Sequence, residues 1–379
     1  MKRNLFYLHI LCAVLCLTAC GGHKTASSSN DQEGDTLVMR HAKNLTVIHY
    51  DHYTAVKLRN PWDTLKTLHT YILVDKNSPE PSSLPEGTIV RIPVEKALIY
   101  SSVHCGLFDE LGIADHIAGI CDLQYIKLEK VRKACLEGRV ADCGNGMNPN
   151  IERIIDLHPD ALLISPFENS GGYGRVEKLG IPIIECADYM ESSPLGRAEW
   201  MRFYGLLTGT ASQADSLFNQ VEQTYLSLSR LAQNEPDRPT VLGELKNGAA
   251  WYVPGGQSTT GQLFEDAGSH YVFASLKQSG SVPLSFETVF NKGEHADFWF
   301  IKYNQAIDKT YSELQRDYAP YSHFDAFKNR RIFGCNTNRV PFYEETPYHP
   351  ERILKDLIKI LHPKLLEGYS TQYFTNLAE

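Results

Sequence analysis

Residues suited to ligand binding follow many of the apolar segments of this sequence. Aromatic rings can stack on a flat ligand, hydroxyl groups and histidine can hydrogen-bond to it, and arginine can pair with a carboxylate. The candidates from these classes lie in or directly after expected strands, and they are Ser102, His104, Tyr125, Phe167, Tyr173, Trp251, Tyr252, Ser258, Tyr303 and Arg339. Each also has a structural explanation in core packing or loop geometry. Together they suit a broad cleft for a flat macrocycle or a catecholate complex.

His104 has three interpretations that the sequence leaves open. A neutral imidazole could ligate iron or cobalt, the same residue could cap a helix, or it could line the cleft. The fourteen histidines are scattered, with no His-x-x-x-His pair and no His-rich loop. This scatter disfavours a bare zinc or manganese site, and the identity of any bound metal stays open.

The motifs of common enzymes are absent from the sequence. Gly171-Gly172-Tyr173-Gly174 lies between an expected strand and an expected helix, where a phosphate loop would lie. It lacks both the Gly-x-Gly-x-x-Gly spacing and a Gly-Lys-Ser/Thr end. There is no Gly-x-Ser-x-Gly elbow and no His-Glu-x-x-His helix. We therefore expect no catalytic residues and no enzymatic activity.

The first residues indicate export. Lys2 and Arg3 precede an apolar run from Leu5 to Leu17, which is shorter than the roughly 20 residues of a membrane-spanning helix. The run ends in Leu17-Thr18-Ala19-Cys20-Gly21, which resembles the lipobox of bacterial lipoproteins. This resemblance implies a signal peptide over residues 1–19 and a lipid on Cys20, although an ordinary cleaved signal remains an alternative. Residues 20–36 are small and polar and are expected to form a flexible tether.

Composition bounds the class of the mature chain. Hydrophobic residues make up 42% and charged residues 22% of the sequence, as in ordinary soluble proteins. The net charge of −8 provides no basic footprint for nucleic acid. Beyond the signal and Cys20 there are six cysteines, of which Cys135 and Cys143 are the closest pair in the sequence. They could form a disulfide in an oxidising compartment, or all six could be buried thiols.

Strand and helix patterns alternate along most of the chain. Residues 37–87 contain short alternating runs that predict a small N-terminal β-hairpin addition. Residues 88–193 and 236–379 alternate apolar strands with helical patterns, which predicts two α/β lobes with mainly parallel sheets. Residues 194–235 lack a strand pattern and are expected to form one long backbone helix.

The two expected lobes repeat one another. Leu107-Phe108-Asp109-Glu110-Leu111-Gly112 matches Leu263-Phe264-Glu265-Asp266-Ala267-Gly268. Later in each lobe, a helix with one early glutamate, Glu152 or Glu287, leads into a strand that starts with aspartate. Two similar lobes joined by a helix should leave a ligand cleft between them.

This organisation resembles the helical-backbone class of periplasmic binding proteins, also called class III, whose members carry ferric siderophores, haem, cobalamin or bare metal ions to ABC importers. The resemblance rests on four segments from Ile92 onward, which are 144–154, 157–163, 191–200 and 255–258. In that family one acidic residue on each lobe docks with arginines of the permease. The positions that match here are Glu152 and Glu287, although each also suits the first turn of a helix.

We therefore expect a monomeric, lipid-anchored, extracytoplasmic substrate-binding protein. The resemblance implies that it captures an iron complex, a siderophore or haem, and delivers it to an ABC permease dimer with its ATPase subunits. Cobalamin is the second candidate ligand, followed by bare zinc or manganese. A lipoprotein that sequesters the same ligand without transport is a further alternative. No intrinsic cofactor and no nucleic acid partner are expected.

Overall fold

The computed structural model describes residues 34–79, 81, 83–168 and 172–379. The expected signal peptide and the expected lipid site, Cys20, lie outside these residues. The first strand, β1 (Asp35–Leu37), overlaps the last two residues of the expected tether.

The N-terminal addition is a five-stranded sheet and not the hairpin that we expected. Its strands pair in chain order, and they are β1, β2 (Leu45–His49), β3 (Thr54–Arg59), β4 (Thr67–Asp75) and β5 (Thr88–Ile92). All neighbours are antiparallel except β4 and β5, which run parallel. β5 lies within residues 88–193, which we expected to belong entirely to the following lobe. It joins this sheet because a long loop after β4 brings Thr88 beside Tyr71 in parallel register.

The N-terminal lobe is built on a parallel sheet. Its order is β12-β11-β6-β7-β8, with bounds Ile183–Glu185, Ala161–Ile164, Ala97–Ile99, Ile117–Ile120 and Ala141–Asp142. The helices between these strands are α2 (Ser102–Glu110), α3 (Glu129–Leu136) and α4 (Ile151–Leu157). β9 (Gly144–Asn145) and β10 (Asn148–Pro149) form a small antiparallel pair before α4.

The C-terminal lobe repeats the central strand order. Its sheet runs β16-β13-β18-β19-β20, with bounds His270–Tyr271, Thr240–Gly243, Phe298–Tyr303, Ile332–Asn336 and Thr375–Asn376. Only β20 is antiparallel. The helices are α8 (Thr259–Asp266), α9 (Phe286–Gly293), α10 (Tyr311–Asp317), α11 (Asp325–Lys328), α12 (Phe342–Glu345) and α13 (Pro350–Leu361). The expectation of two α/β lobes with mainly parallel sheets is confirmed.

One strand in residues 236–379, where we expected a mainly parallel sheet, belongs to a different sheet. β15 (Ala250–Pro254) pairs antiparallel with β14 (Lys246–Asn247) and β17 (Ser281–Leu284) in a separate sheet. Its apolar run, Ala-Trp-Tyr-Val, looks like a buried parallel strand because Trp251 and Val253 are both fully buried.

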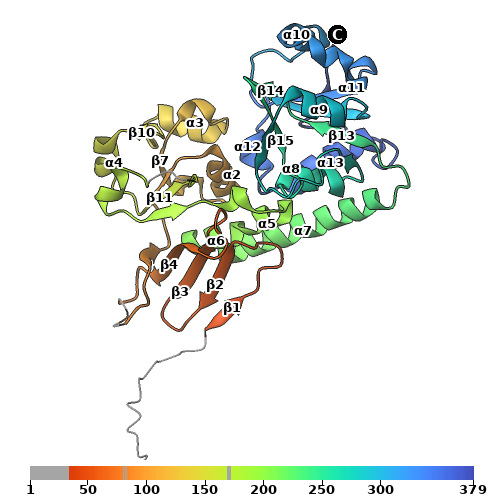
Figure 1. Ribbon diagram of the computed structural model, residues 1–379. Coiled ribbons are helices and arrows are strands. Elements are labelled where there is room, and N and C mark those ends of the chain that lie inside the picture. The colour runs from red at the N-terminus through yellow and green to blue at the C-terminus, as the bar shows by residue number, and fades with distance from the viewer. Residues whose placement is uncertain (1–33, 80, 82, 169–171) are drawn as a thin grey trace, which may run out of the picture. The chain divides into compact units, whose positions relative to one another are not determined.

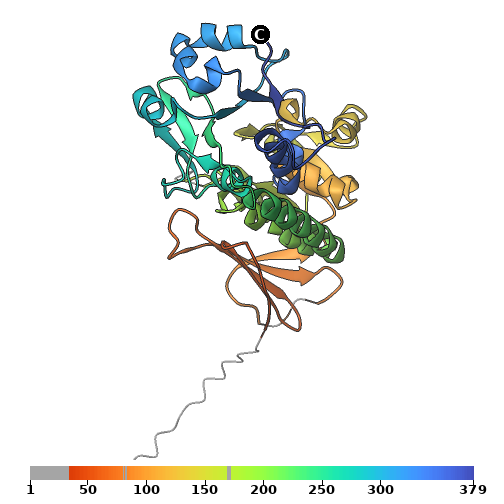
Figure 2. The ribbon, with the colours of Figure 1, turned by 90° about the vertical axis from the view of Figure 1, so that its right-hand side faces the viewer.

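The backbone segment is helical but consists of three helices where we expected one. α5 (Pro194–Glu199) and α6 (Met201–Thr208) precede the 23-residue α7 (Ala211–Gln233). α6 ends because Gly209 adopts the left-handed conformation, with φ of 75°. Figures 1 and 2 show both lobes on one side of these helices and the first sheet on the other. Among the helices in the described part of the chain, none is long and apolar enough to cross a membrane.

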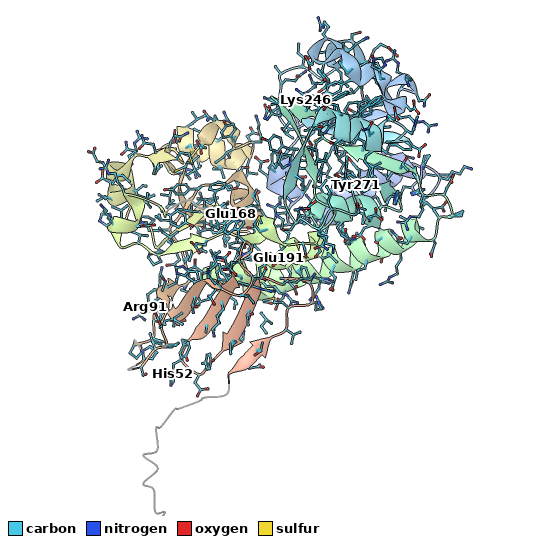
Figure 3. The ribbon with its side chains drawn as sticks, viewed as in Figure 1. His52, Arg91, Glu168, Glu191, Lys246 and Tyr271 are labelled. Carbon is cyan, nitrogen blue, oxygen red and sulfur yellow. The ribbon has the colours of Figure 1, made fainter. Side chains whose placement is uncertain are left out.

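Two buried carboxylates attach the first sheet to the backbone helices. Glu199 accepts hydrogen bonds from the backbone amides of Arg40, His41 and Ala42 at 2.7–2.9 Å. Glu191 accepts from the next two amides, Lys43 and Asn44, and from the Trp200 indole at 2.9 Å. Figure 3 shows Glu191 where the sheet meets α5. Hydrogen bonds to charged groups contribute about 1.5–3 kcal/mol each, so this junction is firm.

The lobes also contact each other directly through α2 and α12. A Cβ added to Gly106 of α2 would lie 2.2 Å from the backbone oxygen of Glu344. The Glu344 side chain accepts a hydrogen bond from the Lys127 amide at 2.8 Å. Nearby, Glu110 pairs with Arg352 at 3.3 Å and with His349 at 3.4 Å. These contacts join the two lobes directly.

Gly106→Ala should separate the lobes at this contact. Alanine normally favours a helix over glycine by about 1 kcal/mol, but here overpacking should dominate and cost about 1–3 kcal/mol. We expect a lower melting temperature and a larger radius of gyration by small-angle X-ray scattering. Gly280→Ala is the control, because a Cβ there meets no atom within 4 Å. Equal stability and size for G106A and wild type would show that the lobes do not touch here in solution.

Candidate inter-lobe ligand site

The strand order locates a crevice in each lobe. Both sheets contain the same core order, β7-β6-β11-β12 and β16-β13-β18-β19. In each set the chain runs from the earliest strand, β6 or β13, to a neighbour on one side and later adds β11 or β18 on the other side. Ligands prefer the carboxyl ends of strands at such switch points. The loops after β6 and β11, and those after β13 and β18, are therefore the places to search.

A buried ion cluster lies at this edge of the N-terminal lobe. Asp188, which follows β12, is 1% exposed. Its carboxylate accepts hydrogen bonds from His104 Nε2 at 3.2 Å, the Tyr204 hydroxyl at 3.1 Å and Arg197 Nε at 3.0 Å. These donors belong to α2, α6 and α5 respectively. One carboxylate thus connects three helices.

The cluster fixes the charge of His104. Burial alone lowers the pKa of His104, but Cys186 and Asp188 outweigh burial and raise that pKa to about 10. Burial raises the pKa of Asp188, yet the hydrogen bond from His104 and the charge of Arg197 bring it below its ordinary value. At neutral pH the pair is an imidazolium and a carboxylate. An imidazolium has no free lone pair for a metal, so of the three interpretations of His104 this arrangement favours a structural role over metal ligation.

Arg197 also faces a cavity at the boundary with the C-terminal lobe. The cavity has a volume of about 80 Å³, and its lining includes Arg197, Glu244, Lys302 and Phe342. We call these four residues the α5 pocket, because its lining comes from α5 and from the C-terminal lobe. Small-molecule sites usually occupy about 300–1,000 Å³, so this space suits one arm of a ligand and not a whole macrocycle.

Glu244 and Lys302 form an ion pair on the C-terminal wall of the pocket. Lys302 Nζ donates to Glu244 Oε1, and although burial lowers the pKa of Lys302, the Glu244 charge raises it above its usual value. Glu244 has a left-handed backbone with φ of 65°. Its backbone is held by bonds of 2.8 Å to the Phe300 carbonyl and from the Trp299 indole. Such strain costs about 1–3 kcal/mol and is often found at ligand sites.

Aromatic rings stand beside the two cations. Lys302 Nζ lies 5.9 Å from the Phe342 ring centroid. The Tyr343 ring meets Phe342 edge to face at 5.2 Å and is 47% exposed. Burial raises the pKa of Tyr343, which the charge of Lys302 partly offsets. The arrangement offers positive charge inside and an aromatic surface outside.

Two expected site residues belong to the ends of neighbouring strands, because Tyr303 ends β18 and Arg339 follows β19. The Tyr303 carbonyl accepts from the Thr337 amide at 2.9 Å, and Arg339 pairs with Asp308 at 2.6 Å. Arg339 is more than half exposed. Tyr125, Phe167 and Tyr252 also present exposed rings, at 62%, 60% and 45%, and Ser102 is half-buried at the start of α2.

Three other expected ligand-binding residues make hydrogen bonds within the protein. Trp251 is fully buried 5.5 Å from Trp299 and donates to the Gly243 carbonyl. Ser258 is buried and caps α8, and Tyr173 donates to Glu185 at 2.9 Å. The expectation failed for Trp251 because β15 does not belong to the parallel sheet, so the rule for carboxyl strand ends does not apply to it.

Sequence reasoning missed Arg197, Glu244, Lys302 and Tyr343 as site residues. Glu244 and Lys302 stand at the ends of two expected strands, so the rule that nominated Tyr303 could have found them. Arg197 and Tyr343 gave no signal, because only folding brings α5 and α12 together. Among the described residues, no group of three or more His, Cys, Asp or Glu side chains is placed to hold a metal ion.

Comparison with known proteins identifies the family. The family model for periplasmic binding proteins matches residues 99–338. The chain belongs to the periplasmic binding protein family. A periplasmic haem-binding protein of Pseudomonas aeruginosa has a similar fold, with a TM-score of 0.59 at 14% identity over 76% of this chain and 99% of its own. The helical-backbone architecture expected from the sequence is therefore confirmed.

Three sequence relatives align with different shares of this chain. An uncharacterised lipoprotein of Methanocaldococcus jannaschii is 25% identical over 98% of this chain and 96% of its own length. The petrobactin-binding protein of Bacillus subtilis is 23% identical over 50% and 47% of the two chains. A cobalamin-binding protein of Halobacterium salinarum is 22% identical over 61% and 60%. The family match begins after the first sheet, whereas the archaeal lipoprotein aligns with nearly the whole chain.

In this periplasmic binding protein, the two expected docking glutamates occupy equivalent places. Glu152 and Glu287 are each the second residue of their helix, α4 and α9, and both are exposed. Asn150 and Ser285 cap these helices by accepting from the amide three residues later. The helices precede the equivalent strands β11 and β18, so their first turns lie toward the carboxyl edges of the sheets.

His104→Gln should weaken the buried cluster. Losing one partner of a buried ion pair costs about 3 kcal/mol, so the free energy of unfolding of the variant should be lower by about that amount. Urea unfolding at pH 7 is the measurement. Because the pKa of His104 is raised on folding, its contribution is complete below about pH 6.5 and is lost as pH rises toward about 10. Wild type should therefore lose more stability than the variant between pH 7 and 10. His323→Gln, at an exposed histidine, is the control. Parallel pH profiles would contradict a charged His104.

Proposed function

We propose that this protein is the substrate-binding component of an ABC importer and that it captures an iron complex, a ferric siderophore or haem, between its lobes. The observation that carries the proposal is the α5 pocket, where Arg197 of α5 and Lys302 of the C-terminal lobe line one cavity. Phe342 also lines this cavity, and the exposed ring of Tyr343 packs against Phe342. The names of the similar proteins, which bind petrobactin, haem or cobalamin, support this ligand class.

Charge and size favour a ligand with an anionic arm. Arg197 uses Nε for Asp188, and no described residue accepts from its terminal nitrogens, which leaves them for a carboxylate or catecholate. Lys302 can turn from Glu244 toward the same group. The cavity of about 80 Å³ holds only that arm, so the body of the ligand would rest outside against Tyr343. Ferric siderophores and haem both combine a bulky body with acidic groups.

Cobalamin is the second candidate. The halobacterial relative named for it aligns over 61% of this chain, more than the petrobactin relative does. A corrin ring would also fit an open aromatic surface. Because cobalamin carries mostly amide side chains, its affinity should depend less on the two cations.

Lys302→Met should lower affinity for an anionic complex at least tenfold, because the substitution removes one charge-assisted contact worth about 1.5–3 kcal/mol. Absorbance titrations of the soluble chain with haem, ferric petrobactin and cobalamin would measure this. Lys364→Met, at an exposed lysine outside the pocket, is the control.

The pattern of binding separates the candidates. Tight binding of cobalamin alone, with equal affinity for K302M, would favour the second candidate. No spectral change with any of the three compounds would refute the proposed ligand class.

The proposed location is the outer side of a bacterial membrane, held by a lipid on Cys20. The lipobox-like segment and the similarity to an archaeal lipoprotein support it. From this position the binding protein would deliver its ligand to a permease dimer and would act as a monomer. Glu152 and Glu287 would contact arginines of the two permease subunits.

Reversing both docking charges should abolish uptake without affecting ligand binding. The variant is Glu152→Arg with Glu287→Arg, and uptake of radiolabelled iron complex by cells that depend on this protein is the measurement. The matched control reverses one exposed glutamate in each lobe elsewhere, Glu137→Arg with Glu367→Arg. Normal import by the docking variant would refute the docking assignment and would favour a role in sequestering the ligand.

A further inference from the structure

Two cysteines lie at the ends of neighbouring parallel strands. β7 and β8 pair Gly119 with Ala141 and Ile120 with Asp142. The next pair in this register is Cys121 and Cys143. The Cys143 amide donates to the Ile120 carbonyl at 2.8 Å, so the pairing continues to this point.

The two side chains share one face of the sheet. Both belong to the small apolar cluster that contains Leu98, Ile154 and Leu162, and they are 1% and 0% exposed. Neighbouring strands lie about 4.8 Å apart, and disulfides join residues whose Cα atoms are about 4.4–6.8 Å apart. The backbone therefore brings the two sulfurs within reach of a bond.

The pair nearest in the sequence is less suited. Cys135 packs against the main core on the other face of the sheet, where Ile99 and Leu163 point. Cys143 points to the small cluster. A bond between them would have to join opposite faces of the sheet. All six cysteines are separate thiols in the structure.

We propose that Cys121 and Cys143 form an intramolecular disulfide when the exported chain folds. Each thiol gives up one proton and one electron, and the two sulfurs form the bond. The oxidant is the disulfide of an exported thiol–disulfide oxidoreductase, which is reduced to its dithiol by those two electrons and protons. The inference rests on the export part of the proposed function and not on the ligand.

The bond must form before the cluster packs. Burial raises the pKa of Cys121 to about 12 and that of Cys143 to about 11. Attack on an oxidant requires a thiolate and access, and the folded protein offers neither. Oxidation therefore occurs during folding, and the finished disulfide is protected from reductants.

The disulfide would hold one wall of the cleft. The chain between the two cysteines contains Tyr125, α3 and Lys127, whose amide binds Glu344 of the other lobe. Closing this loop restricts the unfolded chain and keeps the contact with α12 in place. The disulfide should therefore raise the stability of the protein and should change the positions of the ligand-binding side chains little.

Peptide mapping without reductant tests the pairing directly. The full chain is purified from the cell envelope, alkylated in denaturant and digested with trypsin, which cleaves between the cysteines at Lys127, Lys130 and Arg132. We expect the Cys121 and Cys143 peptides to be linked and two hydrogens lighter than the separate peptides. The chain made without its first 19 residues in a reducing cytoplasm should have both thiols alkylated. Two alkylated thiols in the exported protein, or a Cys143–Cys135 link, would overturn the proposal.

A variant pair checks the consequence. Reductant added during unfolding should lower the urea midpoint of the exported wild type and of Cys135→Ala. It should leave the midpoint of the Cys121→Ala, Cys143→Ala double variant unchanged. An equal fall in the double variant would contradict the assignment. Ligand titration of the reduced protein separates this outcome from a failure of the proposed function, because binding does not require the bond.

Discussion

The arrangement of the site depends on the burial of one negative charge. Asp188 is out of contact with water, and a carboxylate there is tolerated only if hydrogen bonds and opposite charges replace its hydration. His104, Arg197 and Tyr204 supply them from three different helices. Since each donor must reach the same two oxygens, the relative positions of α2, α5 and α6 are fixed. The guanidinium of Arg197 is directed toward the second lobe as a consequence.

The same principle holds the first sheet in place. Glu191 and Glu199 follow Asp188 closely in the chain, and each is buried against consecutive backbone amides of the segment that enters the sheet. Glu222 of α7 adds ion pairs to Arg40 and His41 of the same segment. A single stretch, residues 188–199, thus joins the N-terminal lobe, the sheet and the backbone helices. The family match begins after the sheet, and this stretch is how the additional sheet is accommodated.

Local patterns predicted much of the fold. The alternation of strands and helices in residues 88–193 and 236–379 gave the two lobes, and the repeated Glu152 and Glu287 segments fall on equivalent helices. The wrong predictions concerned strand pairing and side-chain contacts between residues far apart in the sequence. β15 has the composition of a buried parallel strand but pairs antiparallel. His104 was nominated from the sequence, but its buried partner, Asp188, is 84 residues away and gave no signal. Lys302 and Arg197 line the same cavity only because α5 packs against the C-terminal lobe, so no local pattern could join them.

The central claim is that a bulky ligand places an anionic arm between Arg197 and Lys302 while its body rests on the aromatic surface of α12. A crystal structure of the protein with whichever of haem, ferric petrobactin or cobalamin binds most tightly tests this claim most directly. The account predicts a carboxylate or catecholate oxygen within hydrogen-bond distance of both cations, with the metal centre outside the cavity beside Tyr343. A ligand that occupies a different surface, or that leaves the Lys302–Glu244 pair intact and touches neither cation, would contradict it.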